Sequence, residues 1–434
     1  MAKRSIRKER YFKIQLPEKV SFIIGRLEEC GFEAFAVGGC IRDSLLGRQP
    51  GDWDITTSAL PGDIKSAFRR TVDTGIEHGT VTVMLDDESF EVTTYRIDGE
   101  YKDGRHPKEV TFTDAISEDL RRRDFTVNAM AYNEKRGLID LFGGKEDLKK
   151  RVIRCVGDPN DRFDEDALRI LRAVRFAAQL DFDIDSRTRD AISNHAPRLK
   201  AVSKERILTE VSKLICSAHI ERTAEIFQLG IVPYTAKHFR EINIAQLMGL
   251  KRNARHASSI GDAFDLNSST SLENRYIRFA FLTEGMSRES VDEMLRDLKA
   301  DNITRKNAAL LSDRVLSPIP KDRVELKRVM SGMSPELFAD LLRIKLVSAG
   351  TIAYEKYCAD EDICGLIDIY NDIAAAKEPV YLTELAVGGD ELKSHGAAEG
   401  PEIGRLLHRM LEHVWAHPED NNADYLLGIS TVDL

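Results

Sequence analysis

Hydrophobic and polar positions along the chain follow two different periods, and the change from one to the other comes near residue 165. Before that point, short segments alternate apolar with polar residues and are rich in β-branched side chains, which is typical of β-strands. Two further pieces, 42–47 and 61–70, have helical spacing, and the second carries a proline where a helix would begin. Strands are expected at AFAVGG (34–39), DWDITT (52–57), TVTVML (80–85) and FEVTTYR (90–96).

Beyond residue 165, apolar residues recur every three or four positions almost to the end of the chain, a period typical of amphipathic helices. The fold class is therefore expected to be α+β, with a small mixed sheet and its helices in a head, followed by helices alone. Breaks in the pattern divide the chain into a basic N-terminal arm (1–20), the head (21–148), a helical neck (149–210), a helical body (211–300) and a helical tail (301–434).

Charge is distributed unevenly. The chain carries 63 Lys and Arg against 72 Asp and Glu, a net charge of −9. The acidic excess lies in residues 351–434, which hold 5 basic and 17 acidic side chains and leave the preceding part slightly basic. A polyanionic partner is therefore expected to bind the first part of the chain. The 42% of apolar residues exclude a mainly disordered protein.

Cysteine usage and hydropathy bear on the compartment. The six cysteines form no C-x-x-C pair, which is typical of free thiols in a reducing compartment. No segment reaches the roughly 18 apolar residues that a membrane span needs. The basic start of the chain lacks the apolar stretch of a secretory signal. We expect a cytoplasmic protein that does not associate with membranes.

The segment GGCIRDSLLGRQPGDWDI, residues 38–55, carries the first chemical signal. Gly38 and Gly39 follow an apolar strand and open a predicted helix, so that backbone N–H groups can approach a phosphate there. Arg42 lies one helical turn further on and would face the same anion. These residues predict a phosphate-binding site at the start of the helix.

Two carboxylates follow on the next predicted strand. Asp52 and Asp54 are two residues apart, so their side chains would lie on one face of the strand. A D-x-D pair alone often marks a turn or a solvated edge, but the preceding glycines and Arg42 favour a Mg²⁺ site, because this ion prefers carboxylate oxygens. Glu91, on another predicted strand, would either complete the metal site or orient it through a hydrogen bond.

The segment DLRRRDFTVNAMAYN, residues 119–133, places three arginines beside a carboxylate. Unpaired arginines are costly to bury, which makes Arg123 a candidate ligand for a triphosphate and Asp124 a candidate acceptor for a ribose hydroxyl. Asn128, one turn further on a helix that Thr126 opens, is a candidate for a supporting polar contact to the nucleotide. A solvated charged face is the alternative, and the apolar residues that follow make it less favourable.

The segment DRFDEDALRILRAVRFA, residues 161–177, repeats charged residues every three positions. Asp166, Arg169, Arg172 and Arg175 are expected to form one stripe on a helix. A stripe of acid–base pairs on a solvated surface is one interpretation. The other is recognition of a nucleobase, because a carboxylate and a guanidinium offer an acceptor and donors to the edge of a base.

The order of these motifs, together with TYRIDGEYKDGRHP and LIDLFGGKEDL, resembles the bacterial-type class II CCA-adding enzymes, which are tRNA nucleotidyltransferases. That family shares its head with bacterial poly(A) polymerases, within the polymerase-β superfamily. The resemblance covers roughly residues 30–215 and extends more weakly to 385–421. Residues of about 235–350 match only as helical.

The resemblance implies that the protein adds C, C and A to the 3′ end of tRNA from CTP and ATP, without a nucleic-acid template and with release of pyrophosphate. It implies that Asp52 and Asp54 bind the catalytic Mg²⁺ and that Asp166 and Arg169 pair with the base. The loop 97–109 resembles the segment associated with the switch from C to A addition. The nucleotide contacts implied are Gly39, Arg42, Arg123 and Asp124, with Arg172 and Arg175 at further arginine positions of the site.

Other functions stay open at this point. An enzyme that adds only CC or only A would share these motifs, and residues 105–107 read Arg-His-Pro where the family has Arg-Arg-Pro. A poly(A) polymerase shares the head, but the loop and the tail favour a tRNA enzyme. An inactive RNA-binding homologue would have no need of Asp52 and Asp54, and a small substrate would not need so long a helical remainder. The oligomeric state is left open.

Overall fold

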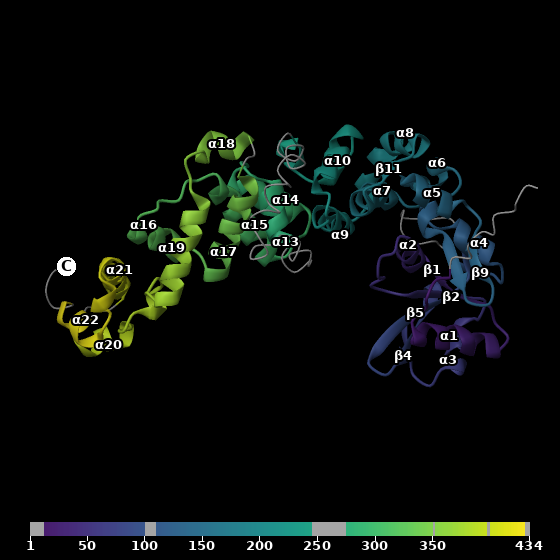
Figure 1. Ribbon diagram of the computed structural model, residues 1–434, viewed down its shortest axis with the longest axis horizontal. Helices are drawn as coiled ribbons and strands as arrows, with labels where there is room; N and C mark the ends of the chain where they lie inside the picture. Colours follow the sequence, from purple (N-terminus) through teal and green to yellow (C-terminus); the bar gives the residue numbers. More distant parts are fainter. Residues whose placement is uncertain (1–12, 100–109, 245–274, 350–351, 397–399, 430–434) are drawn as a thin grey trace, which may run out of the picture. The chain divides into compact units, whose positions relative to one another are not determined.

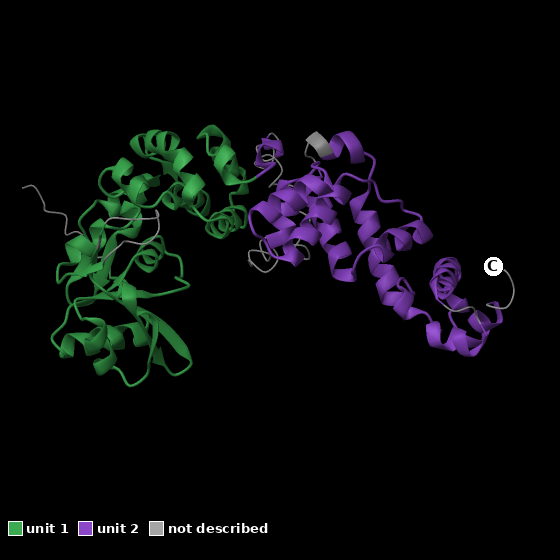
Figure 2. Ribbon diagram, turned by 180° about the vertical axis from the view of Figure 1, so that it is seen from behind, with its two compact units in different colours: residues 1–236 green, residues 237–434 purple. Residues whose placement is uncertain are grey.

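The computed structural model describes residues 13–99, 110–244, 275–349, 352–396 and 400–429. The chain forms two compact units, residues 1–236 and 237–434, which Figure 2 shows in different colours. These units are coarser than the five segments expected from the sequence, whose bounds stay predictions. Most of the loop 97–109, including all of Arg105–Pro107, lies outside the described residues.

The first unit contains a seven-stranded mixed sheet, as the alternation of apolar and polar residues predicted. Its strand order is β3-β4-β5-β2-β1-β8-β9. All neighbouring strands are antiparallel except β2 and β5, which run parallel with Ile55 opposite Val92. The strands are β1 Ala34–Val37, β2 Asp54–Thr57, β3 Thr71–Gly75, β4 Thr80–Leu85, β5 Glu88–Thr94, β8 Met130–Asn133 and β9 Gly137–Asp140.

The two faces of this sheet are covered by different elements. Helices α1 (Glu18–Glu29) and α3 (Pro61–Ala67) pack on the face that carries Ile55 and Val92 (Figure 1). On the opposite face, helix α4 (Ile116–Arg121) covers an apolar cluster that includes Phe35, Val37, Tyr95, Leu120 and Ala131. Asp54 lies on this second face, because it pairs with Val37 in the register of β1 and β2.

Two small elements differ from the expectation. Asn128 was expected on a helix opened by Thr126, and the structure has only one 3₁₀ turn there, η2 (Thr126–Asn128), before strand β8 begins at Met130. The expectation was wrong because the following apolar residues pair with β1 and β9 instead of continuing the turn. The helix expected at 42–47 is α2, which spans Gly39–Leu45.

The neck begins as two helices instead of one. The sequence predicted a single charged stripe from Asp166 to Arg175, but helix α6 (Pro159–Glu165) ends before Asp166 and helix α7 (Leu168–Leu180) begins after it. Asp166 has extended backbone angles, and its carboxylate accepts a hydrogen bond from the backbone N–H of Leu168. Short side chains that bond to a nearby N–H favour helix starts over helix interiors. Helices α8 (Ser186–His195) and α9 (Lys204–Ile215) then pack against α6 and α7, respectively.

Every element of the second unit, within the described residues, is a helix. No helix in the described ranges is both long and apolar enough to span a membrane. The longer helices are α13 Arg275–Leu282, α14 Arg288–Asp297, α15 Asn302–Val315, α16 Arg323–Ser331, α17 Pro335–Ser348, α19 Ile363–Ala376 and α21 Pro401–Ala416, and the shorter ones include α18 Ile352–Cys358, α20 Gly389–Ser394 and α22 Ala423–Ile429.

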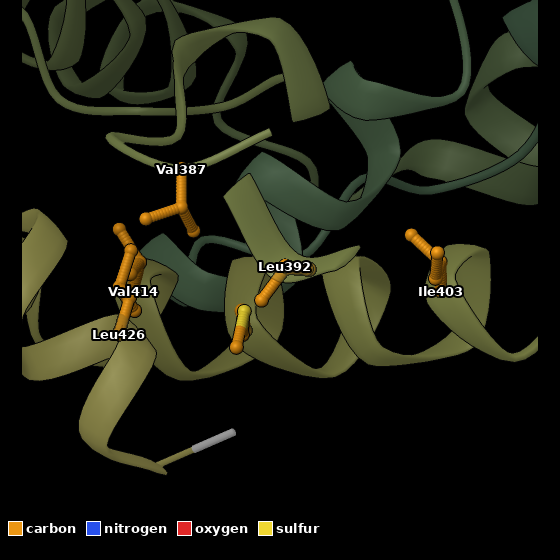
Figure 3. Packing of buried hydrophobic residues seen from close by; sticks show 6 residues of the cluster. Val387, Leu392, Ile403, Val414 and Leu426 are labelled. Atoms are coloured by element: carbon orange, nitrogen blue, oxygen red, sulfur yellow. The ribbon is translucent and has the colours of Figure 1, made fainter. Parts of the chain in front are cut away.

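The end of the chain has a small apolar core of its own, which we call the tail cluster. It joins α20, α21 and α22, as the side chains in Figure 3 show. Leu392, Met410, Val414 and Leu426 have no solvent exposure. The members of the cluster are Val387, Leu392, Ile403, Met410, Val414 and Leu426.

We expect Leu426→Ala to lower the free energy of opening of the tail cluster by about 2–5 kcal/mol, because it removes buried methyl groups and leaves a cavity. Hydrogen exchange of the α21 amides in the full chain measures this opening. Asp424→Ala, at an exposed position of the same helix, is the matched control. Equal protection of α21 in both variants would contradict the packing described here.

Candidate nucleotidyl-transfer site

Asp52 and Asp54 lie at the start of strand β2. Asp54 is the first residue of the strand and Asp52 precedes it, and both are exposed. Among the described residues, neither carboxylate has a hydrogen-bond or ion-pair partner, whereas the buried acids Asp119, Asp124 and Glu210 are paired with arginines. Protein packed around Asp54 raises its pKa; the charge of Arg123 opposes this shift and the charge of Asp52 adds to it. Two adjacent, unpaired carboxylates fit a hard divalent cation, which would relieve their repulsion.

Glu91 lies beside Asp54. Strand β5 runs parallel to β2, and the pairing of Ile55 with Val92 places the two preceding residues on the same face of adjacent strands. The strand of Glu91 therefore pairs directly beside the strand of Asp54. In the described ranges no group of three or more His, Cys, Asp and Glu side chains is arranged as a metal site. Glu91 as a metal ligand or as an orienting group thus stays a prediction.

Two glycines bring backbone and arginines close together next to these carboxylates. Gly38 has a φ of +86°, which favours glycine, and a Cβ built there would lie 3.0 Å from Nη1 of Arg123. A Cβ at Gly39 would lie 3.6 Å from Nη2 of Arg42. Gly38 therefore lets the Arg123 guanidinium approach the turn between β1 and α2, whereas a Cβ at Gly39 would make only an ordinary contact with Arg42.

Arg42 begins a chain of buried polar contacts that runs from the head into the neck. Its Nη1 donates to Oδ1 of Asn128 at 2.6 Å, and its Nε and Nη2 donate to the carboxylate of Asp43. Nδ2 of Asn128 donates in turn to Oδ1 of Asp124 at 3.1 Å. Arg172 of helix α7 donates to Oδ2 of Asp124 from Nε at 2.8 Å and from Nη2 at 2.6 Å.

Asp124 is buried, and its hydrogen bonds are saturated. Its Oδ1 accepts from the N–H of Phe125 and from Asn128, and its Oδ2 accepts twice from Arg172. A carboxylate has about four acceptor positions, so all of them are taken. Burial alone would raise the pKa of Asp124, but Arg172 and these hydrogen bonds hold it well below its usual range. A ribose hydroxyl could bind here only if one of these donors gave way.

Helix α9 continues the contacts through a buried carboxylate. Glu210 is 4% exposed and accepts from Nε of Arg175 at 2.5 Å, with Nη1 of Arg172 at 3.7 Å. Arg175 also donates to Gln179 at 2.7 Å. The ring of Phe176 lies between arginines, with the guanidinium carbons of Arg42, Arg172 and Arg175 at 5.2, 5.4 and 3.8 Å from its centroid. Both arrangements hold the arginines in fixed directions.

Arg123 is oriented by a third buried carboxylate, that of Asp119. Asp119 has no solvent exposure and accepts from Arg122 at 2.8 and 3.0 Å and from Nη2 of Arg123 at 3.3 Å. Burial would raise the pKa of Asp119, but the two arginines outweigh this and keep the pKa low. Oγ1 of Thr56 also donates to Asp119 at 3.2 Å. Asp119 thus links the strand of Asp54 to Arg123.

Asp166 and Arg169, the predicted base-recognition pair, have separate partners. Nη2 of Arg206, on α9, donates to Oδ2 of Asp166 at 2.7 Å. Arg169 donates to Glu165 at 2.5 Å and to the backbone carbonyl of Arg122 in the head at 2.9 Å. Arg169 and Arg175 are buried and Arg172 is partly buried, and all three are paired with acids, so the surface-stripe interpretation does not describe them.

Several residues of this site were not among those predicted from the sequence. Asp119, Phe176, Arg206 and Glu210 each hold a predicted nucleotide-site residue in place. Arg206 and Glu210 are four residues apart in the segment KERILTE, a spacing that puts two side chains on one helix face. This spacing is the one signal in the sequence that could have indicated these two residues. An exposed ion pair on a helix surface has the same spacing.

Two family models match the first unit. The Poly A polymerase head domain matches residues 34–154, and the probable RNA and SrmB-binding site of polymerase A matches residues 181–239. With the mixed sheet and the carboxylates at the start of β2, these matches define the chain as a nucleotidyltransferase with a head of the poly(A) polymerase type. Enzymes of this class generally use a divalent metal ion.

Comparison over the whole length narrows the class to one family. The CCA-adding enzymes of Lactobacillus helveticus and Lactiplantibacillus plantarum are each 35% identical over 408 and 414 residues, which is 93% and 94% of this chain and 94% of each relative. The crystal structure of the Bacillus stearothermophilus CCA-adding enzyme in complex with CTP is 30% identical, with a TM-score of 0.76 and 95% of both chains covered. The chain belongs to the family of CCA-adding enzymes.

The Asp124–Arg172 pair makes the stability of the first unit depend on pH. Because the pKa of Asp124 is lower in the folded than in the unfolded chain, the pair stabilises the fold above about pH 4 and loses this effect as the pH falls. We expect Asp124→Asn to lower the free energy of unfolding by about 3 kcal/mol near neutral pH, because it removes the nearer of the two acids that pair with Arg172.

Urea unfolding of both proteins at several pH values, followed by a probe in the first unit, measures this difference. The wild-type advantage should be constant near neutral pH and shrink steadily on acidification below about pH 4. An advantage that does not change with pH would show that the charge of Asp124 contributes no stability.

Proposed function

We propose that this protein adds C, C and A in turn to the 3′ end of tRNA from CTP and ATP, releasing pyrophosphate at each step, in the cytoplasm. The observation that carries the proposal is the pair of unpaired carboxylates, Asp52 and Asp54, next to arginines that are already fixed by buried acids. The likeness over the full chain to CCA-adding enzymes supports the choice of product.

Asp52 and Asp54 would hold Mg²⁺, the divalent ion that prefers carboxylate and phosphate oxygens. Bound there, the ion would lower the pKa of the RNA 3′-hydroxyl and neutralise charge on the triphosphate. The donor set fits, since both carboxylates are exposed at the start of β2 and have no other partner among the described residues. Glu91 lies beside them as a further ligand or as an orienting group.

The triphosphate would bind where Gly39, Arg42 and Arg123 meet. Arg42 is fixed by Asp43 and Asn128, and Arg123 by Asp119, so neither guanidinium has to be ordered when the nucleotide arrives. Positive groups fixed beforehand stabilise the charge that develops on the phosphates without reorganisation. Asp124, with Asn128, would serve the ribose side of the same site, provided that one of its present donors moves.

The base would be recognised by Asp166 and Arg169 without a nucleic-acid template. A carboxylate accepts hydrogen bonds and a guanidinium donates them, so together they match the amino groups and ring acceptors of C and A. A base with the wrong pattern leaves buried polar groups unpaired, which is a strong source of selectivity. Arg172 and Arg175 would complete the positive lining of the site.

The helical part of the chain would bind the folded tRNA. Double-stranded RNA is recognised mainly by its shape and through backbone and 2′-hydroxyl groups, so base-specific side chains are not needed there. The first 350 residues carry the basic surplus, and the acidic excess is confined to residues 351–434. We therefore place most of the contact with the RNA before residue 351.

Incubation of the purified full chain with Mg²⁺, labelled CTP and ATP, and tRNA that lacks its 3′ end tests the proposal. We expect three additions, read at one-nucleotide resolution, that end in A. The double variant Asp52→Ala, Asp54→Ala should show none, because it removes the metal ligands. Asp87→Ala, which removes an exposed carboxylate from the turn between β4 and β5, should retain the activity.

Other products would identify other enzymes. Addition that stops after CC, or addition of a single A only to tRNA ending in CC, would contradict complete CCA addition and show a split activity. A long run of A on unrelated RNA would mean a poly(A) polymerase. No addition by the wild-type chain would overturn the proposed activity and favour an RNA-binding homologue.

A further inference from the structure

Arg206 forms an ion pair with Asp166, a residue that the proposed function assigns to base recognition. It belongs to helix α9, 40 positions after Asp166, and its Nη2 donates to Oδ2 of Asp166 at 2.7 Å. The other oxygen of Asp166, Oδ1, accepts from the N–H of Leu168 at 3.0 Å. The exposed fractions of the two side chains are only 16% for Asp166 and 20% for Arg206.

These two contacts fix the plane of the Asp166 carboxylate. One oxygen is tied to the start of helix α7 and the other to helix α9, so the group cannot rotate without breaking a bond. Each oxygen accepts about two hydrogen bonds and has one partner among the described residues, which leaves an acceptor position on each for a ligand. The Arg169 guanidinium is oriented by different partners, Glu165 and the carbonyl of Arg122.

A fixed acceptor distinguishes the four nucleobases in a simple way. Cytosine and adenine carry an amino group, a hydrogen-bond donor, at C4 and C6, where uracil and guanine carry a carbonyl oxygen. A carboxylate held in place binds the first pair and repels the oxygen of the second. A carboxylate free to turn would lose part of this difference, because it could swing away from an unfavourable oxygen.

We infer that Arg206 is a positioning residue for base selectivity: by holding Asp166 from α9, it makes the site accept C and A and reject U and G. The inference rests on the proposed function for the identity of the substrates. If Arg206 only joined α9 to α7, its loss would weaken the binding of all four nucleotides by a similar factor. The two roles therefore differ in their effect on the ratio between nucleotides.

Equilibrium binding of CTP, ATP, UTP and GTP to the full chain with Mg²⁺ and without RNA measures this ratio. We expect Arg206→Gln to reduce the preference for CTP over UTP about tenfold or more, the discrimination that one well-placed set of base contacts provides. Arg206→Lys, which keeps a charged donor, should recover part of the preference. An unchanged ratio in Arg206→Gln would overturn the inference.

Arg198→Gln is the matched control. Arg198 pairs with Asp164, two residues before Asp166, and both of these side chains are about half exposed. The change removes the same charge from the same neck without touching Asp166. Its nucleotide preference should equal that of the wild type, and a loss as large as that of Arg206→Gln would overturn a specific role for Arg206.

The same measurement in an Asp166→Ala background shows whether Arg206 acts through Asp166. We expect Arg206→Gln to cause no further change in preference there, since the carboxylate that it positions is gone. A further change of the same size would overturn the inference. Because binding is read without RNA, these results stand apart from the addition assay: a chain that prefers CTP and ATP but adds nothing would refute the proposed activity alone.

Discussion

The ion pair between Asp124 and Arg172 is the interaction on which the arrangement of the site depends. Asp124 follows the arginines of the head, and Arg172 belongs to the first long helix of the neck, so the pair joins two segments 48 positions apart. A buried charge is costly unless a partner and further hydrogen bonds compensate for it. Asn128 then connects the pair to Arg42, and Glu210 connects it to Arg175, which fixes both ends of the nucleotide site relative to each other.

The acidic residues of the site have two different roles, which depend on whether they are paired with an arginine. The buried acids Asp119, Asp124 and Glu210 hold arginines in direction, but around them the arginines outnumber the acids, which leaves a positive surplus for a triphosphate. Asp52 and Asp54 are the opposite case, with no partner among the described residues and with mutual repulsion that a divalent cation would relieve. In the proposed function, the triphosphate would bind to the fixed arginines and the metal ion to the two carboxylates that lack a partner.

Local patterns in the sequence predicted the secondary structure that depends on residues close together along the chain. Alternation of apolar residues located the strands at 34–37, 54–57 and 80–85. The strand expected over 52–57 begins only at Asp54, so Asp52 precedes it instead of belonging to it. The break at Asp166 was not predicted, because the hydrogen bond that its carboxylate accepts from the N–H of Leu168 competes with a helical pattern that continues on both sides.

Contacts between residues far apart in the sequence could not be predicted from local patterns either. The parallel pairing that brings Glu91 beside Asp54 joins strands 37 positions apart. Arg206 and Glu210, as charged residues on a helix, have the pattern of a solvated face.

The most direct test of the account is a double-mutant cycle on CTP affinity between Asp124 and Arg172. The full chain with Mg²⁺ is titrated with CTP as wild type, Asp124→Asn, Arg172→Gln and the double variant. If the two residues act as one unit that positions the site, each single change weakens CTP binding and the double variant is no weaker than the weaker single variant. Effects that multiply in the double variant would show that the two side chains contact the nucleotide independently and would contradict the account.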